Sequence, residues 1–389
     1  MSELLESRWQ ETKSALLEGL NGTKKAVMAS TLENTRKYLA ETAGTGATSA
    51  GNIATLNRVI LPVIRRVMPT VIANELVGVQ PMTGPVGQIH TLRVRYAETN
   101  DNAIAGAEAL SPFNIATAYS GTGTDPAGVA DSTASLEGSA GRKMSIQIMK
   151  QTVEAKSRKL SARWTFEAAQ DAQSMHGIDV EAEIMAALAQ EITAEIDQEV
   201  LNSLVTLSGT AAQTYDQAAV SGTATFVGDE HAALAVQINR VSNLIAQRTR
   251  RGAGNWAVVS PFALTILQSA TTSAFARTTE GTFEAPTNTK MVGTLNSAMK
   301  VYVNTYAADN APVLIGYKGT SESDAAAFYC PYIPLMSSGV VLDPSSFEPV
   351  VSFMTRYGYV ELSNSASSLG NAADYLGNVA ITSGNVSFS

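Results

Sequence analysis

Apolar side chains recur at every fourth position over residues 177–207, and this run is the strongest periodic pattern in the chain. The positions are Val180, Ile184, Leu188, Ile192, Ile196, Val200 and Leu204. Because an α-helix has about 3.6 residues per turn, a repeat of four winds slowly around the helix instead of staying on one side. The pattern predicts one long helix over 177–207 that contacts different partners along its length.

Closer to the N-terminus, apolar and polar side chains alternate along the chain. In the segment ELVGVQPMTGPVGQIHTLRVRY, residues 75–96, glycines and prolines crowd together, and then Leu92, Val94 and Tyr96 alternate with Thr91, Arg93 and Arg95. Glycine and proline shape irregular backbone, whereas alternation is typical of a strand with one apolar and one cationic face. We predict a shaped connection that leads directly into a strand.

A second alternating segment, with Met144, Ile146 and Ile148, predicts a returning strand. The intervening residues 101–141 are rich in Gly, Ala, Ser and Thr and hold few large apolar side chains. Long segments of this kind inside a domain are uncommon and are usually functional or mobile. We therefore expect residues 88–156 to form a long hairpin with a loosely packed tip.

The remaining patterns combine helices with strands that cluster late in the chain. Residues 2–41 carry two helical patterns, and the Gly/Ala/Thr/Ser-rich segment 42–52 follows as a linker. A helix over 229–251 begins with acidic residues and ends with arginines, which suits the helix dipole, and Ser260-Pro261 marks the start of another. Strand patterns cover 300–306, 311–319, 325–333 and 347–362. The predicted class is α+β.

The composition favours a protein with much of its surface in contacts. Of the 389 residues, 45% are hydrophobic and only 16% are charged, and interface cores are depleted in charge. A net charge of −8 argues against a dedicated nucleic-acid binder. The single cysteine, Cys330, cannot form an intramolecular disulfide, which fits a reducing compartment. No apolar run approaches the ~18 residues of a membrane span.

Charges are strongly segregated along the sequence. Residues 164–239 contain twelve acidic residues and no Lys or Arg, whereas residues 142–163 contain seven basic residues and one acidic residue. We expect complementary patches that meet within or between subunits. The candidate inter-subunit contacts are Arg93, Arg95, Lys150, Lys156, Arg158, Lys159, Arg163, Glu195, Asp197 and Glu199.

The sequence offers no convincing catalytic, cofactor or metal site. The three histidines, His90, His176 and His231, are far apart and lack metal-ligand spacing. Cys330 lies in the apolar segment AFYCPYI and reads as a buried structural thiol. An alternative is an enzyme that uses the carboxylates of the long helix as a metal site, but a solvated or partner-facing acidic face explains these carboxylates better.

Several segments resemble the major capsid proteins of contractile-tailed phages of the T-even type. The resemblance begins with GVQPMTGPVGQ and continues through VEAKSRKLSARWTFEAAQDAQSMHGIDVEAE (153–183), RTRRGAGNW (248–256), GYKGTSESDAAAFYCPYIPL (316–335) and FEPVVSFMTRYGYV (347–360). The segments occur in the family's order over about residues 53–362. An encapsulin-like nanocompartment shell is the rival reading, and the family-specific segments argue against it.

The resemblance implies a shell subunit with the HK97-like tailed-phage capsid fold. The expected parts are a helical N-terminal segment 1–41, an N-arm and linker 42–87, and an E-loop hairpin 88–156. A peripheral domain 157–228 with spine helix 177–207, an axial domain 229–345, and a peripheral return strand and C-terminal tail 346–389 complete it. T-even relatives carry a folded insertion in the hairpin region, for which residues 101–141 are too short.

The resemblance also implies partners and a processing step. The subunit is expected to form hexamers and pentamers of an icosahedral head, assembled in the host cytoplasm and located in the virion. Expected partners are portal and scaffolding proteins, a prohead protease, a decoration protein, and packaged double-stranded DNA at the inner surface, with no membrane. The protease of T-even relatives cuts after Glu in Leu/Ile-x-Glu, and Leu39-Ala40-Glu41 fits, which gives Glu41–Thr42 as the candidate site.

Overall fold

The computed structural model describes residues 13, 14, 17 and 25–34 and, with gaps, residues 72–362 and 372–386. The gaps after residue 72 are 101–102, 108, 110–117, 125–126, 139, 177–178, 221–226, 250, 271–274, 278–289, 297, 321–323, 347, 363–371, 383 and 385. The chain divides into two units, each built from separate segments. The first unit comprises 1–87, 153–202 and 328–360, and the second comprises 88–152, 203–327 and 361–389.

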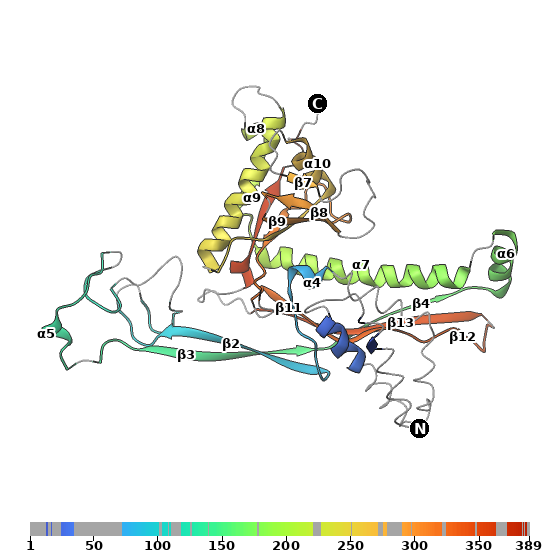
Figure 1. Ribbon diagram of the computed structural model, residues 1–389, viewed down its shortest axis with the longest axis horizontal. Coiled ribbons are helices and arrows are strands. Elements are labelled where there is room, and N and C mark those ends of the chain that lie inside the picture. The colour runs from blue at the N-terminus through green and yellow to red at the C-terminus, as the bar shows by residue number, and fades with distance from the viewer. Residues whose placement is uncertain are drawn as a thin grey trace. The chain divides into compact units, whose positions relative to one another are not determined.

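The first unit is organised around a five-stranded sheet (Figure 1). Its strands are β1 (Gly78–Val79), β4 (Lys156–Arg163), β11 (Ala327–Ser337), β12 (Val341–Leu342) and β13 (Pro349–Glu361). β1 runs parallel to β11, and β4 and β12 pair antiparallel with β13. Alternate residues of β13 are buried from Pro349 to Tyr357, so one face of this strand faces a core.

The expected long helix is confirmed as α7 (Val180–Ser208), and α4 (Ala73–Leu76) and α6 (Phe166–His176) are shorter. Burial of the winding stripe changes along α7. Val180 and Ile184 are only partly buried, whereas Ile192, Ile196, Val200 and Leu204 are almost fully buried. The apolar stripe is therefore exposed in part at the N-terminal end of α7 and becomes fully buried towards its C-terminal end.

The hairpin is the ribbon of β2 (Val86–Tyr96) and β3 (Met144–Glu154), and α5 (Thr133–Leu136) lies near its tip (Figure 1). The Gly/Pro-rich segment before β2 ties its root to the first sheet. The N–H of Gln80 donates to the carbonyl of Tyr329, and the N–H of Met82 donates to the carbonyl of Pro331. The N–H of Ala155 donates to the carbonyl of Pro85 at 2.9 Å, which closes the root between the two strands.

The tip of the hairpin is better packed than the sequence predicts. Tyr96, Ala103, Ala109 and Tyr119 form a small buried cluster, and the two tyrosine rings lie 4.5 Å apart. The guanidinium of Arg142 donates to the carbonyls of Ala118, Tyr119 and Gly121. The expectation of a loosely packed tip is wrong for this part, because two tyrosines and one arginine replace the large aliphatic side chains that mark a core in a sequence.

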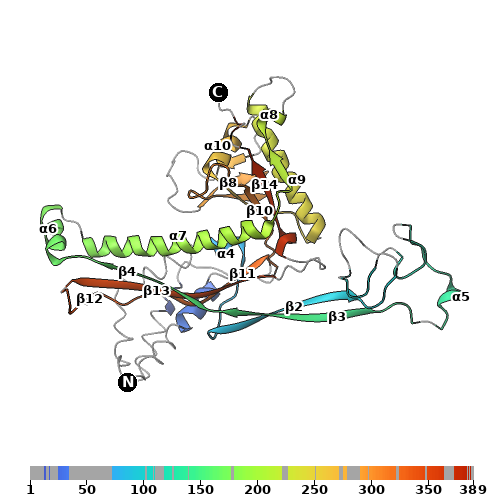
Figure 2. The same cartoon turned by 180° about the vertical axis from the view of Figure 1, so that it is seen from behind.

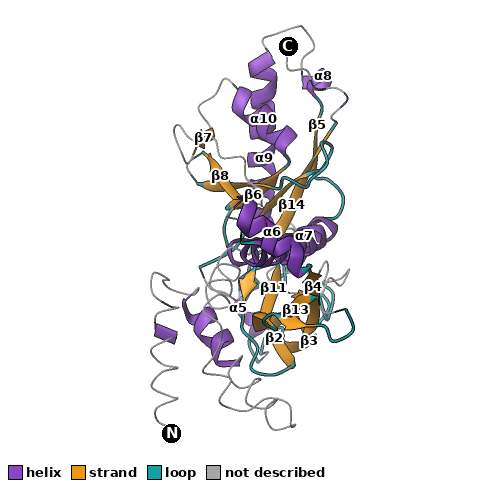
Figure 3. Ribbon diagram, turned by 90° about the vertical axis from the view of Figure 1, so that its right-hand side faces the viewer, coloured by secondary structure: helices purple, strands orange, loops and turns teal. Residues whose placement is uncertain are grey.

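The second unit also contains a seven-stranded sheet. Its order is β5 (Gln213–Tyr215), β14 (Leu376–Ile381), β10 (Val313–Gly316), β6 (Trp256–Val259), β9 (Met299–Val303), β8 (Lys290–Leu295) and β7 (Phe275–Arg277). Helices α9 (Val227–Thr249) and α10 (Pro261–Ser269) lie beside these strands in Figure 3 and share their hydrophobic core. The short helices α8 (Gln217–Val220) and η2 (Ala372–Tyr375) complete the unit. The expected start of α10 is confirmed, because the Ser260 hydroxyl accepts from the N–H of Ala263 and Pro261 follows.

The sheets divide the chain differently from the expected boundaries. β11 falls inside the expected axial segment 229–345, yet it pairs with β1 in the five-stranded sheet. β14 falls inside the expected peripheral segment 346–389, yet it lies between β5 and β10, where Figure 2 labels it beside β10. Neighbours in sequence suggested both assignments, whereas the actual strand pairs join residues far apart in the chain. The α+β class is confirmed.

We predict that Gly358→Ala destabilises the root of the hairpin more than Gly87→Ala does. A Cβ at Gly358 would lie 2.5 Å from the Val153 side chain and 3.2 Å from the Glu154 carbonyl oxygen. A Cβ at Gly87 would meet only side-chain atoms, the nearest at 3.1 Å. Overpacking costs about 1–3 kcal/mol, so we expect that loss for Gly358→Ala and less than about 1 kcal/mol for Gly87→Ala. Denaturant unfolding of the unassembled chain measures both, and equal losses would contradict the prediction.

Candidate assembly interface

One arginine gathers two of the acidic residues that the sequence offered as inter-subunit contacts. Arg158, on β4, donates to Glu195 at 2.6 Å and to Glu199 at 2.5 Å, both on α7. Its Nε donates to the hydroxyl of Tyr357 on β13 at 2.6 Å, and that hydroxyl donates to Glu199. Tyr357 also lies against Tyr329, with ring centroids 5.4 Å apart. The network therefore ties the spine helix to the sheet within one subunit.

The pKa values of this network show that the charged forms are favoured. Burial alone would lower the pKa of Arg158, but its hydrogen bonds to Glu199 and Tyr357 raise that pKa above its ordinary value. Burial would raise the pKa of Glu199, and the hydrogen bonds from Arg158 and Tyr357 outweigh it, so the pKa is lowered. Arginine and glutamate therefore remain an ion pair, and the guanidinium bridges two carboxylates with one terminal nitrogen for each.

Asp197 lies two residues from both Glu195 and Glu199, so it projects from a different face of α7. Asp197 is only 2% exposed, so it is buried within its own subunit. Its Oδ1 accepts from the N–H of Ile72 at 2.9 Å, whereas its Oδ2 has no hydrogen-bond partner among the described residues. Burial raises the pKa of this carboxyl to about 7, against the lowering effect of the Ile72 N–H.

The other candidate cations are spread over the surface. Lys156 and Lys159 on β4 are exposed, and Lys150 on β3 is exposed. Arg163 lies 3.7 Å from Glu348, and its side chain is 72% exposed, so this pair contributes only about 0–1 kcal/mol. Arg95 is half-buried, and its Nε has no hydrogen-bond partner among the described residues. The side chain of Arg93 lies outside the described residues.

An exposed row of apolar side chains lies on the hairpin. Met144, Ile146 and Ile148 alternate along β3 and are 52%, 68% and 67% exposed. Within the part of the chain that the structure describes, this sheet consists of β2 and β3 alone. A large aliphatic side chain contributes about 1.5–3 kcal/mol when it moves from water into a packed contact. Three such side chains in one row therefore favour binding of this ribbon to another surface.

Sequence reasoning identified these three residues as a strand and missed their exposure. The signal was present, because alternation in a strand normally marks a face that packs on a core. A hairpin of two strands separated by more than forty intervening residues supplies no such core. The contact surface could have been predicted from an alternating strand for which the rest of the sequence offers no layer to pack against.

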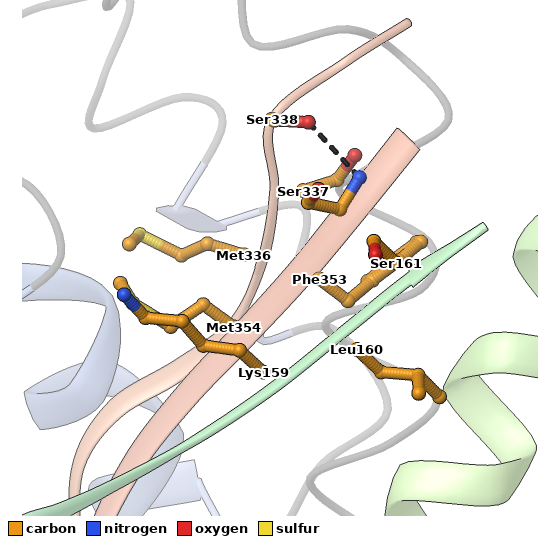
Figure 4. A pocket seen from close by; sticks show the side chains of 9 residues that line it. Lys159, Leu160, Ser161, Met336, Ser337, Ser338, Phe353 and Met354 are labelled. Carbon is orange, nitrogen blue, oxygen red and sulfur yellow. Dashed lines mark hydrogen bonds between the residues drawn. The ribbon is translucent and has the colours of Figure 1, made fainter. Parts of the chain in front are cut away.

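A shallow pocket of about 470 Å³ lies on the five-stranded sheet (Figure 4). Its lining residues are Lys159, Leu160, Ser161, Met336, Ser337, Ser338, Ser352, Phe353 and Met354. Figure 4 shows Lys159, Met336 and Met354 on one side of the strands and Leu160 on the other. Lys159 is the only titratable group in this lining, so the pocket brings together no acid–base pair.

Cys330 is the buried thiol that the sequence predicted: it is 2% exposed, and burial raises its pKa to about 11. Among the described residues, no group of three or more His, Cys, Asp or Glu side chains could hold a metal ion. No helix in the described part of the chain is long and apolar enough to cross a membrane. The candidate processing site, Glu41–Thr42, lies outside the described residues.

The chain is similar to known proteins over most of its length. The family model described as "Major capsid protein Gp23" matches residues 53–140 and 121–381. The major capsid protein of Enterobacteria phage T4 is 31% identical over 414 aligned positions, which cover 82% of this chain and 78% of that protein. The major capsid protein of Vibrio phage KVP40 is 29% identical, with coverage of 83% and 80%. That of Serratia phage KSP90 is 28% identical, with coverage of 92% and 90%.

Solved structures show weaker similarity. A structure titled "Microbacterium phage Oxtober96" has a TM-score of 0.48 and 12% identity, and covers 79% of this chain and 90% of its own. A structure titled "The capsid of Myoviridae Phage XM1" has a TM-score of 0.45 and 10% identity, with coverage of 80% and 91%.

A long ribbon that exposes a row of apolar side chains outside its small tip cluster is typical of a subunit of an assembly. The family match and the 31% identity to the T4 protein specify which kind: the chain belongs to the Gp23 major capsid protein family. It is a structural protein of a tailed-phage head and is located in the virion. The matched relatives are phage capsid proteins, so the encapsulin-like alternative is not supported.

We predict that Asp197→Asn stabilises the subunit above neutral pH. The carboxyl has a pKa of about 7 in the folded chain, well above its ordinary value, so its ionised form is disfavoured by folding. This penalty is absent below the unfolded pKa, grows as the pH rises towards the folded pKa, and is complete above it. Asparagine removes the charge and keeps an oxygen for the Ile72 N–H.

A shift of about three pKa units corresponds to about 4 kcal/mol, so unfolding of the unassembled chain should show a gain of up to about 4 kcal/mol near pH 8 and less than about 1 kcal/mol near pH 4. Glu191→Gln, at an exposed position of the same helix, is the control and should change stability little at either pH. If Asp197→Asn gave the same gain at both pH values, the prediction would be wrong, because ionisation of the carboxyl would then carry no free-energy cost in the folded chain.

Proposed function

We propose that the chain assembles as hexamers and pentamers into a closed icosahedral shell, in which the β2–β3 hairpin lies across an adjacent subunit. The observation that carries this proposal is the exposed row of Met144, Ile146 and Ile148. Family membership implies self-assembly, and the row identifies where the subunit supplies apolar area for it. Each ribbon buried in this way would add to an interface at the obligate end of the size range.

The ion pairs contribute differently from the expectation that basic and acidic stretches bind neighbouring subunits. Arg158 already uses Glu195 and Glu199 within the subunit, so these residues position the helix that presents the shell surface. Lys150 and Lys159 are exposed and remain candidates for inter-subunit contacts. Inter-subunit specificity would then come from the apolar ribbon together with a few peripheral cations.

The seven-stranded sheet with α9 and α10 would form the axial domain, and the five-stranded sheet with α7 would form the peripheral domain. This division follows the strand pairs, and it places β11 in the peripheral domain and β14 in the axial domain. The expected boundaries at 228, 345 and 346 would shift accordingly, while the N-arm and linker would remain at 42–87.

The subunit would work without catalysis, cofactor or metal. Family membership in a structural protein supports this role. The rival reading of a metal enzyme relied on the carboxylates of the long helix. Glu195 and Glu199 are bound by Arg158, and Asp197 is held by a backbone N–H, so three of those carboxylates are committed to structure.

The proposed partners follow from the shell role. Portal and scaffolding proteins would act during assembly, and a decoration protein would stabilise a hairpin that lacks the insertion of T-even relatives. Residues 42–74 contain Arg58, Arg65 and Arg66 and no acidic residue. This arm would therefore tolerate packaged double-stranded DNA at the inner surface, through phosphate contacts without sequence preference.

We predict that Ile146→Ser combined with Ile148→Ser weakens shell assembly without unfolding the subunit. Both side chains are about two-thirds exposed, so the isolated subunit loses little packing. Val236→Ser, at a position on α9 that is 67% exposed, is the matched control. Analytical ultracentrifugation and negative-stain microscopy should show fewer shells for the double variant and normal shells for the control. Normal assembly of the double variant would contradict the proposed role of the ribbon.

We also predict that a prohead protease removes residues 1–41 during maturation. The cut would follow Glu41 in Leu39-Ala40-Glu41, next to the glycine-rich linker, where an extended substrate can bind a protease. The removed segment holds six basic and six acidic residues, so its loss leaves the net charge unchanged. Intact-mass analysis of the coat protein from DNA-filled particles should give a chain beginning at Thr42. A full-length mass would show that the segment is a permanent part of the shell.

A further inference from the structure

The helix at residues 25–34 buries one face against its own subunit. Val27, Met28, Thr31 and Leu32 are between 0% and 7% exposed, whereas Lys25 and Ala26 are exposed. These buried positions are spaced at three and four residues, which is the spacing of one helix face. The helix is thus packed on the subunit as an amphipathic element, although it lies in the segment proposed for removal.

The last described residue of this helix reaches the root of the hairpin. The side-chain amide of Asn34, itself 7% exposed, donates to the carbonyl oxygen of Met82 at 2.6 Å. Because a buried polar group without a partner is costly, this bond holds Asn34 against Met82.

Met82 occupies the centre of that root. Its N–H donates to the carbonyl of Pro331 on β11, which fixes it to the five-stranded sheet. Its side chain lies within van der Waals reach of the space beside Gly87 and Gly358, where β2 begins and β13 passes. Three residues further on, Pro85 accepts from Ala155 and closes the two hairpin strands. A restraint on Met82 is therefore a restraint on the point where the hairpin leaves the sheet.

We propose that the helix at 25–34 is a releasable clamp on the root of the β2–β3 hairpin. While the helix is present, Asn34 holds the Met82 carbonyl. When the helix leaves, that carbonyl loses its donor and the root opens more readily. The timing of release rests on the proposed cleavage after Glu41, whereas the clamp itself is a property of the full-length chain.

The clamp links two functions that are far apart in sequence. A protease that cuts after Glu41 would remove the helix without touching the hairpin, yet the hairpin root would lose a hydrogen bond and a packed neighbour. The direction of the ribbon that carries Ile146 and Ile148 could then be adjusted after the subunits have assembled. This coupling is a local event at Met82 and needs no change in the strands themselves.

Native-state hydrogen exchange on the full-length, unassembled chain tests the clamp. Asn34→Ala removes the side-chain donor, and Lys25→Ala, at an exposed position of the same helix, is the matched control. The reporter amides are those of Met82 and Ala155, which form the root bonds. The reference amide is that of Lys318, which is bonded to the side chain of Asn255 in the second unit.

We expect Asn34→Ala to speed exchange at Met82 and Ala155 about fivefold, as the loss of one hydrogen bond implies, with Lys318 unchanged. Lys25→Ala should leave all three amides unchanged. Unchanged exchange at Met82 and Ala155 in Asn34→Ala would overturn the clamp, and so would an equal rise at Lys318, because the effect would then be global.

Met28→Ala is the second variant, since it trims the buried helix face and keeps Asn34. It should produce the same local pattern at the root, and a root that is unaffected by both variants overturns the proposal. Because these measurements use the uncleaved chain, they separate the clamp from the processing step. If the coat protein in particles has the full-length mass and Asn34→Ala still speeds exchange at the root, cleavage is rejected and the clamp is retained.

Discussion

Among the described residues, the β2–β3 ribbon has no layer of its own chain that covers the row of Met144, Ile146 and Ile148. This constraint governs the rest of the structure. The ribbon of β2 and β3 exposes Met144, Ile146 and Ile148 to solvent in the single chain, which is unfavourable unless another surface receives them. The subunit therefore has to supply a firm root for a ribbon whose packing lies elsewhere. The hydrogen bonds of Gln80, Met82 and Ala155 form that root.

The charged residues around Arg158 support the hairpin root indirectly, because they hold α7 against the five-stranded sheet. Arg158 joins the edge strand β4 to α7 through two carboxylates and to β13 through Tyr357. A planar guanidinium can hold two carboxylates in fixed directions, which an ammonium group cannot do as well. One arginine of the basic stretch and two carboxylates of the acidic stretch are thus paired inside the first unit, and the exposed lysines are available for other contacts.

The sequence predicted the elements better than their pairing. The stripe from Val180 to Leu204, the cap at Ser260 and the alternation in β3 each depend on local rules, and each corresponds to an observed element. The placement of β11 and β14 could not be read in this way, because strand neighbours are chosen by long-range packing. The tip core escaped notice because Tyr96, Tyr119 and Arg142 do not form an apolar run. Asp197 was taken for a surface charge, since spacing on a helix does not reveal which face is covered.

The position of β14 has a consequence for synthesis. This strand comprises residues 376–381 and lies inside the seven-stranded sheet, hydrogen-bonded to β5 on one side and β10 on the other. A ribosome must therefore translate almost the whole described chain before the sheet can close, because β5 and β10 wait for a strand that arrives last. Chains that terminate before residue 376 would lack the strand between them. A chain truncated before residue 376 therefore cannot complete the seven-stranded sheet, and it cannot enter a growing shell with a fully folded second unit.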